Sequence, residues 1–137
     1  MAEKTEKVFN SFSLQGIMKT FGAELDSAQN GKAVITCNLN ERLTQQNGFF
    51  HAGVLTTLVD SACGYAAYTT MPDDADVLTV EFKVNFLKPV ILQKVYAVGR
   101  VIHTGKTLVV TEGIITDEKQ EIVYVKMLAT MMTILKK

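Results

Sequence analysis

Residues 52–68 form an apolar segment that no proline interrupts, and this segment constrains the fold more than any other feature of the chain. Its apolar side chains recur three and four residues apart, as in a helix with a wide apolar face. They are Val54, Leu55, Leu58, Val59, Ala62, Tyr65 and Ala66. Pro72 ends the segment, because proline lacks a backbone donor and restricts the residue before it. The sequence therefore predicts one long helix.

Four segments after Pro72 have the pattern of β-strands. In residues 78–87 the side chains of Val80, Phe82, Val84 and Phe86 alternate with polar ones, which is typical of a half-buried strand. Three more strands are predicted at residues 95–102, 107–116 and 122–135, separated by short connections rich in turn-forming residues. We expect the four strands to form an antiparallel meander.

The N-terminal part adds two shorter elements. Residues 8–22 predict a short amphipathic helix, which Gly16 breaks and Gly22 ends, and residues 31–40 predict a first strand. Because no linker or repeat divides the sequence, residues 1–137 are expected to form a single domain. The predicted fold class is α+β: a curved antiparallel sheet wrapped around one long central helix. Since that helix is apolar nearly all round, we expect a homo-oligomer, either a dimer with a continuous sheet or a tetramer built from two such dimers.

The overall charge excludes several classes of partner. Fourteen lysines and arginines balance fourteen acidic residues, so the basic surface of a nucleic-acid-binding protein is missing. Four of the first ten residues are charged, and no apolar run approaches the roughly 20 residues of a membrane span, so we expect a soluble, cytoplasmic protein without membrane contact. Cys37 and Cys63 lack metal-ligand spacing, and we interpret both as buried free thiols rather than metal ligands.

Asp60 is the one charged residue within the predicted central helix. The positions on its side of the helix all carry small residues, namely Gly53, Thr56, Thr57, Cys63, Gly64 and Ala67. Such a stripe lets a ligand or another chain approach the carboxylate. The simpler interpretation is that Asp60 only hydrogen-bonds a buried backbone or hydroxyl group. A central position disfavours that interpretation, because a buried charge without a partner is costly.

The start of the same helix offers hydrogen-bond donors to a carbonyl oxygen. The first backbone N–H groups of a helix lack intrahelical partners, and Gly53 has no side chain to block the approach to its N–H. Asp60 lies about 10 Å further along the helix axis, too far to act on the same carbon within one chain. In an oligomer with antiparallel helices, Asp60 of a partner could complete the site.

The sequence from residue 45 to residue 67, QQNGFFHAGVLTTLVDSACGYAA, resembles the signature of hotdog-fold acyl-CoA thioesterases, in particular the phenylacetate-pathway group. In that signature an acid follows a His-Gly-Gly triplet, nine residues after the histidine. The likeness extends over nearly the whole chain and includes residues 78–90 and 103–132. It implies a helix enclosed by a sheet, in agreement with the fold expected from the residue pattern. Ala52 replaces the first glycine of the triplet.

The resemblance also implies roles for individual residues. Asp60 would be the catalytic carboxylate, either as nucleophile or as general base. Gly53 would polarise the thioester carbonyl, Gln45 would face the thioester or the water, and Thr79 would help to place the water. His51 would bond its own loop rather than transfer protons. Phe50 and Asn47 complete the loop that faces the substrate.

Several basic residues could bind the phosphates of coenzyme A, although for each one alone a solvated surface charge is the better explanation. They are Lys83, Lys88, Arg100, His103 and Lys106. The sequence thus favours an acyl-CoA thioesterase that needs no metal or organic cofactor, with a site shared across a dimer interface. Two alternatives remain open: a hotdog dehydratase or hydratase acting on acyl thioesters, and a non-catalytic acyl-CoA-binding module.

Overall fold

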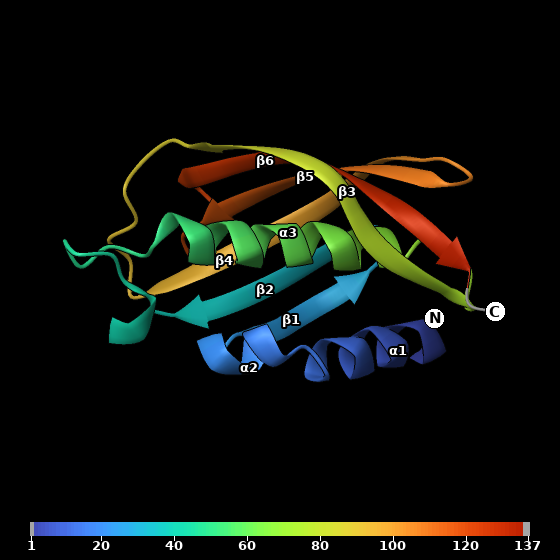
Figure 1. Cartoon of the computed structure of the whole chain (residues 1–137), viewed down its shortest axis with the longest axis horizontal. Coiled ribbons are helices and arrows are strands. Elements are labelled where there is room, and N and C mark those ends of the chain that lie inside the picture. Colours follow the sequence, from blue (N-terminus) through green and yellow to red (C-terminus); the bar gives the residue numbers. More distant parts are fainter. Residues whose placement is uncertain (1, 136–137) are drawn as a thin grey trace.

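The central helix predicted from the sequence is α3, Ala52–Tyr68, and a six-stranded sheet curves around it in the computed structural model, which describes residues 2–135 (Figure 1). The strands follow the order β1-β2-β4-β5-β6-β3, and every neighbouring pair is antiparallel. The other elements are α1 (Ala2–Ser13), α2 (Gly16–Phe21), β1 (Glu24–Gln29), β2 (Lys32–Asn38), the 3-10 turn η1 (Glu41–Leu43), β3 (Ala75–Phe86), β4 (Lys94–Thr104), β5 (Leu108–Thr116) and β6 (Val123–Leu135).

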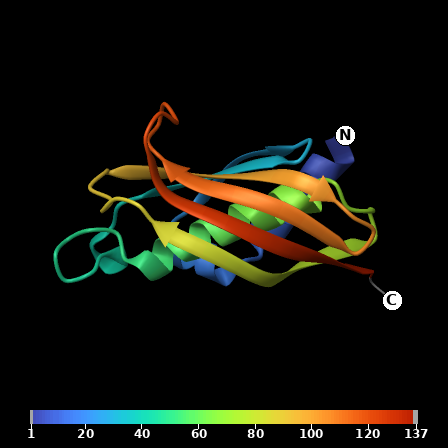
Figure 2. The same cartoon turned by 90° about the horizontal axis from the view of Figure 1, so that it is seen from above.

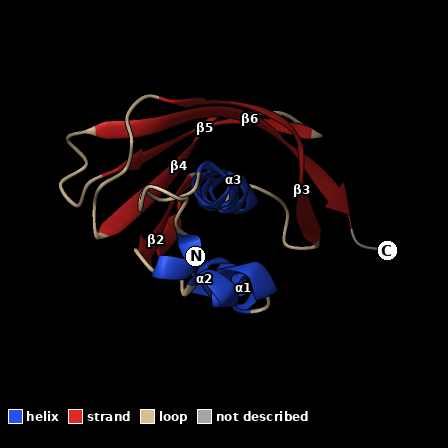
Figure 3. Ribbon diagram, turned by 60° about the vertical axis from the view of Figure 1, so that its left-hand side comes forward, coloured by secondary structure: helices blue, strands red, loops and turns tan. Residues whose placement is uncertain are grey.

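α3 lies close against the middle of the sheet (Figure 2). A Cβ atom at Gly113 on β5 would lie 2.5 Å from Val59 and 2.6 Å from the Sγ of Cys63, and one at Gly99 on β4 would collide with the backbone carbonyl of Ala62. Glycine at these two strand positions therefore permits the close packing of helix and sheet. On the other side of α3 from β5 and β6, α1 and α2 cover the helix (Figure 3).

Both cysteines are buried and free, as the sequence predicted. Cys63 lies on the sheet-facing side of α3, and burial raises the pKa of its thiol to about 12. Cys37 lies in β2, and burial raises the pKa of its thiol to about 11. Thiols with such pKa values stay protonated at neutral pH, so both side chains act as small apolar groups of the core.

The prediction for the N-terminal segment was incomplete. Instead of a single helix over residues 8–22 there are two, α1 and α2, separated by a break at Leu14–Gln15. β1, a short polar edge strand, was not predicted from the sequence. Asn30 and Gly31, both with positive φ, form the tight turn that pairs β1 with β2, as in two-residue hairpins.

The predicted four-strand meander was wrong in one respect. β4, β5 and β6 do follow each other in the sheet, but β3 pairs with β6 instead of β4. β3 is therefore an edge strand. Of its alternating apolar residues, Val84 is partly buried against the core as expected, whereas Val80, Phe82 and Phe86 are between 42% and 51% exposed. The alternation also breaks at a bulge between Thr79 and Glu81.

Candidate active site

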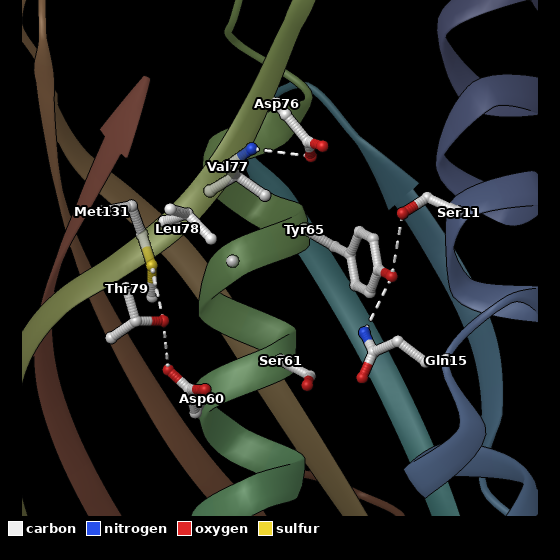
Figure 4. Close-up of a pocket in the computed structure, with 11 residues that line it drawn as sticks. Ser11, Gln15, Asp60, Ser61, Tyr65, Asp76, Val77, Leu78, Thr79 and Met131 are labelled. Atoms are coloured by element: carbon white, nitrogen blue, oxygen red, sulfur yellow. Dashed lines mark hydrogen bonds between the residues drawn. The ribbon is translucent and has the colours of Figure 1, made fainter. Parts of the chain in front are cut away.

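Asp60 projects from the middle of α3 toward β3, where it meets Thr79 (Figure 4). The Thr79 hydroxyl donates a 2.8 Å hydrogen bond to Oδ1 of Asp60. The same hydroxyl lies 3.4 Å from the Sδ atom of Met131 on β6, its cross-strand neighbour. Because a hydroxyl group has a single hydrogen, Thr79 donates it to the stronger acceptor, the carboxylate of Asp60. Two of the predicted catalytic residues are therefore in direct contact.

The surroundings of Asp60 favour the protonated form of its carboxyl group. Burial raises the pKa of Asp60, and the hydrogen bond from Thr79 lowers it to a smaller extent. A carboxyl group with a raised pKa is a better proton acceptor when ionised than an exposed aspartate. The side chain is nevertheless reachable, since Asp60 lies on the partly open face of α3.

Asp60 and Thr79 line a cavity of about 310 Å³ between α3, β3 and the N-terminal segment (Figure 4). Most of the other lining residues were not identified from the sequence. The full set is Ser11, Gln15, Ser61, Gly64, Tyr65, Asp76, Val77, Leu78 and Met131. Gly64 was noted only as part of the small-residue stripe, and it leaves open space, since nothing lies within 4 Å of a Cβ built there. The helical spacing from Asp60 indicates Gly64, four residues later, but no local pattern points to Tyr65, Ser11 or Gln15.

At the start of α3 the side chain of His51 caps the helix. Nδ1 of His51 accepts the backbone N–H of Gly53 at 2.8 Å. His51 thus bonds within its own loop, and the Gly53 N–H expected to bind a carbonyl oxygen already has an acceptor. A carbonyl oxygen at this position would share that N–H with His51 or displace its ring. Gly53 itself is exposed.

Gln45 organises the loop that leads into α3. Its side-chain oxygen accepts the backbone N–H groups of Asn47, at 2.5 Å, and Phe49, at 3.2 Å. Gln45 and Phe50 line a second cavity, of about 360 Å³, together with Lys88. The remaining walls are mostly apolar and come from Phe49, Ala52, Leu55, Phe86, Leu87, Pro89 and Val90. Asn47 is exposed in the loop and is not among the lining residues.

The predicted catalytic residues thus form two separate groups within the chain. Asp60 and Thr79 belong to the cavity beside the middle of α3, whereas Gln45, His51 and Gly53 lie around the helix start. Gly53 and Asp60 are seven positions apart, which corresponds to about 10 Å along the helix axis. A single chain does not bring them to one carbon atom.

Only one of the basic residues predicted to bind phosphate lines either of these two cavities, namely Lys88. Lys83 pairs with Leu128 of β6, so it lies on the convex face of the sheet, opposite to Thr79. Arg100 and His103 lie on the same convex face, and Lys106 belongs to the β4–β5 connection. The bulges in β3 and β4 set these orientations, and no sequence pattern had indicated them.

Within residues 2–135, no group of three or more histidine, cysteine, aspartate or glutamate side chains lies close enough to hold a metal ion. Among the helices of the same residues, none combines the length and the apolar character required to span a bilayer.

Comparison with known proteins identifies the family. Residues 47–124 match the Thioesterase superfamily. The chain is 33% identical over 107 residues to the 1,4-dihydroxy-2-naphthoyl-CoA hydrolase of Listeria monocytogenes, an alignment that covers 78% of this chain and 87% of the relative.

Solved structures agree with this result. A thioesterase family protein from Silicibacter pomeroyi superposes with a TM-score of 0.91 at 40% identity, over 96% of this chain and 98% of that one. The PaaI protein from the phenylacetic acid degradation operon of E. coli has the same fold, with a TM-score of 0.80 at 21% identity over 95% of each chain. The resemblance seen in the sequence is thereby confirmed: the chain belongs to the thioesterase superfamily, a family of thioester hydrolases, and has the hotdog fold.

Proposed function

We propose that this protein hydrolyses acyl-CoA thioesters to the free acid and coenzyme A, with Asp60 as the catalytic carboxylate. The observation that carries the proposal is the Asp60–Thr79 pair: a carboxylate with a raised pKa, held at 2.8 Å by a hydroxyl group in a cavity of about 310 Å³. Hydrolysis of a thioester at neutral pH needs a positioned base or nucleophile of this kind.

The chemistry can follow either of two routes. As a general base, Asp60 takes a proton from water while the water oxygen bonds to the thioester carbon. The C–S bond then breaks, and the coenzyme A thiolate leaves and is protonated. As a nucleophile, Asp60 itself bonds to that carbon and expels the thiolate, and water then hydrolyses the resulting anhydride. Both routes place negative charge on the carbonyl oxygen, which needs hydrogen-bond donors.

We propose that the Gly53 N–H at the start of α3 is such a donor, shared with or released by the His51 ring, and that it acts on a substrate held by Asp60 of a partner subunit. The separation of Gly53 and Asp60 along one helix, about 10 Å, supports this arrangement. The exposed edge of β3 supports it as well, because a long apolar edge strand is unfavourable in a monomer. An antiparallel partner would place its Asp60 against the Gln45 loop.

The cavity beside the Gln45 loop supports the choice of coenzyme A as the leaving group. Its walls are mainly apolar, as the pantetheine arm requires, and Lys88 supplies one cation for a phosphate. The named activity of the Listeria relative, a CoA thioester hydrolase, points to the same substrate class.

A thiol-release assay with acyl-CoA substrates of different chain length tests the proposal. We expect turnover without added metal or organic cofactor, and we expect loss of turnover in Asp60→Asn. Tight binding of acyl-CoA without release of thiol would favour the non-catalytic alternative. Loss or gain of an acyl-chain double bond, followed by absorbance, would favour the hydratase alternative.

A further inference from the structure

The cavity at Asp60 ends in a wall of hydrogen-bonded polar groups (Figure 4). Tyr65 lies five residues after Asp60 on α3, which corresponds to about 7.5 Å along the helix axis. Its hydroxyl oxygen accepts a 2.8 Å hydrogen bond from Nε2 of Gln15 and lies 3.1 Å from the hydroxyl oxygen of Ser11. Ser11, Gln15 and Tyr65 are referred to below as the end wall.

The end wall has hydrogen-bonding capacity left for a ligand. Ser11 and Tyr65 carry two hydroxyl hydrogens, and the hydrogen bond between them uses only one. Whichever residue donates, the other hydroxyl still has its hydrogen. The side-chain oxygen of Gln15 can accept a hydrogen bond, since the contact to Tyr65 uses only its amide nitrogen. The end wall can therefore both donate to and accept from a ligand hydroxyl.

Packing of Tyr65 and a contact of α1 hold the end wall in place. Tyr65 is buried, and its ring contacts Phe12 and Tyr68 at centroid distances of 5.9 and 6.4 Å. α1 is in turn tied to the end of α3, because Lys4 donates to the carbonyl oxygen of Met71 at 2.9 Å. Rigid donors and acceptors select between ligands more strongly than mobile ones do.

The charged residues that line the cavity are all acidic. Asp60 and Asp76 both line it, and none of the described lining residues is a lysine, arginine or histidine. A second carboxylate on a bound acyl group would meet two acids and no cation. The size of the cavity, about 310 Å³, is roughly twice the 150 Å³ of an engineered protein cavity that holds benzene. It thus suits an acyl group of moderate length.

We propose that Ser11 and Gln15 of the N-terminal segment, together with Tyr65, are specificity-determining residues that receive the far end of the acyl group. They favour an acyl group whose far end carries an uncharged hydroxyl over one that ends in a methyl group, while Asp76 disfavours one that ends in a carboxylate. The inference rests on the proposed function, because it takes the Asp60 cavity as the acyl-binding cavity.

Three acyl-CoA thioesters that differ only at the far end of the acyl group test the inference: hexanoyl-CoA, 6-hydroxyhexanoyl-CoA and adipoyl-CoA. For the wild type we expect kcat/KM to be highest for the hydroxy ester and lowest for adipoyl-CoA. Dissociation constants of the same three esters, measured by calorimetry on Asp60→Asn, should show the same order. This second readout does not depend on turnover.

Two variants remove the end wall in different ways. The double variant Ser11→Ala and Gln15→Leu removes the polar groups of the N-terminal segment, and Tyr65→Phe removes one hydroxyl while keeping the ring. In each, the ratio of kcat/KM for 6-hydroxyhexanoyl-CoA to that for hexanoyl-CoA should fall about five- to tenfold, as expected for a lost hydrogen bond.

Control variants separate selectivity from folding and from charge. Ser13→Ala alters an exposed serine of α1 whose hydroxyl donates to the Asn10 carbonyl oxygen and which does not line the cavity, so its ratios should match the wild type. Asp76→Asn should raise kcat/KM for adipoyl-CoA relative to hexanoyl-CoA several-fold. Melting curves of all variants report any loss of folded protein.

The outcomes distinguish the two proposals. If hexanoyl-CoA is hydrolysed but the ratios are the same in wild type, Tyr65→Phe and the double variant, the end-wall inference is overturned and the thioesterase proposal stands. If no ester is hydrolysed but the dissociation constants keep the expected order, the proposed function fails and the end wall is supported. Equal affinity for all three esters overturns the inference regardless of turnover.

Discussion

The hydroxyl of Thr79 on β3 donates to Oδ1 of Asp60 on α3 at 2.8 Å, which joins the edge strand of the sheet to the middle of the central helix. The contact holds the carboxylate in one orientation at the wall of its cavity. It also opposes the effect of burial on the pKa of Asp60.

Asp60→Asn should lower kcat by roughly 10² to 10⁴, because an amide neither attacks a thioester nor accepts a proton well. Its side-chain oxygen can still accept from Thr79, so the fold should be retained. A thiol-release assay measures the effect, and Asp26→Asn, which alters an exposed residue of β1, serves as the matched control. Undiminished turnover in Asp60→Asn would refute the catalytic role.

Thr79→Val should shift the acidic limb of the pH–rate profile to higher pH. The hydrogen bond from Thr79 lowers the pKa of Asp60, and valine cannot donate it. We expect kcat at neutral pH to fall about tenfold, since a hydrogen bond to a charged group is lost. Thr79→Ser keeps the hydroxyl and should restore both the profile and most of the rate. If the role of Thr79 is purely structural, the acidic limb of the pH–rate profile in Thr79→Val should stay at the wild-type pH.

Asp60→Asn should also raise the melting temperature at neutral pH. Burial raises the pKa of Asp60 in the folded protein above its value in the unfolded chain, so the folded state holds the proton more tightly. The ionised side chain therefore opposes folding above both pKa values, and this cost disappears as the pH falls below them. The difference in melting temperature between variant and wild type should shrink in acid. A difference that is constant with pH would contradict the assignment.

Mixing Asp60→Asn subunits with Gln45→Ala subunits should restore activity. If each site combines Asp60 of one subunit with the Gln45 loop of the other, a hybrid dimer has one site with both residues intact. Activity after co-refolding, compared with each parent alone, measures this effect. Hybrids as inactive as their parents would show that both residues serve the same site from one chain.

Gly53→Val should lower kcat/KM sharply in a protein that still melts cooperatively. A Cβ at this position would lie 3.1 Å from Nδ1 of His51, so the added side chain disturbs the cap and blocks the approach to the N–H. Loss of one oxyanion donor costs about 10² to 10³ in rate, while loss of the helix cap costs the fold about 1 kcal/mol. A well-folded variant with most of its activity would exclude the helix start as the carbonyl site.

Local patterns in the sequence were enough to predict the central helix and most strands. The bounds of α3 follow from its apolar spacing and from Pro72 beyond its end, and β4, β5 and β6 follow from period-two patterns separated by turn residues. Asp60 stood out for the same reason, as a charged group within an apolar helix. These features depend on neighbours within a few positions, which the sequence displays directly.

The remaining features were decided by tertiary structure, because they depend on residues far apart in the chain. The pairing of β3 with β6 leaves no local signal, and β1 is too short and polar to stand out without the hairpin that supports it. Bulges in β3 and β4 turn Lys83 and His103 away from the cavities. The end wall is the clearest case: Ser11 meets Tyr65 across 54 positions, and only the packing of α1 beside α3 brings their hydroxyl groups together.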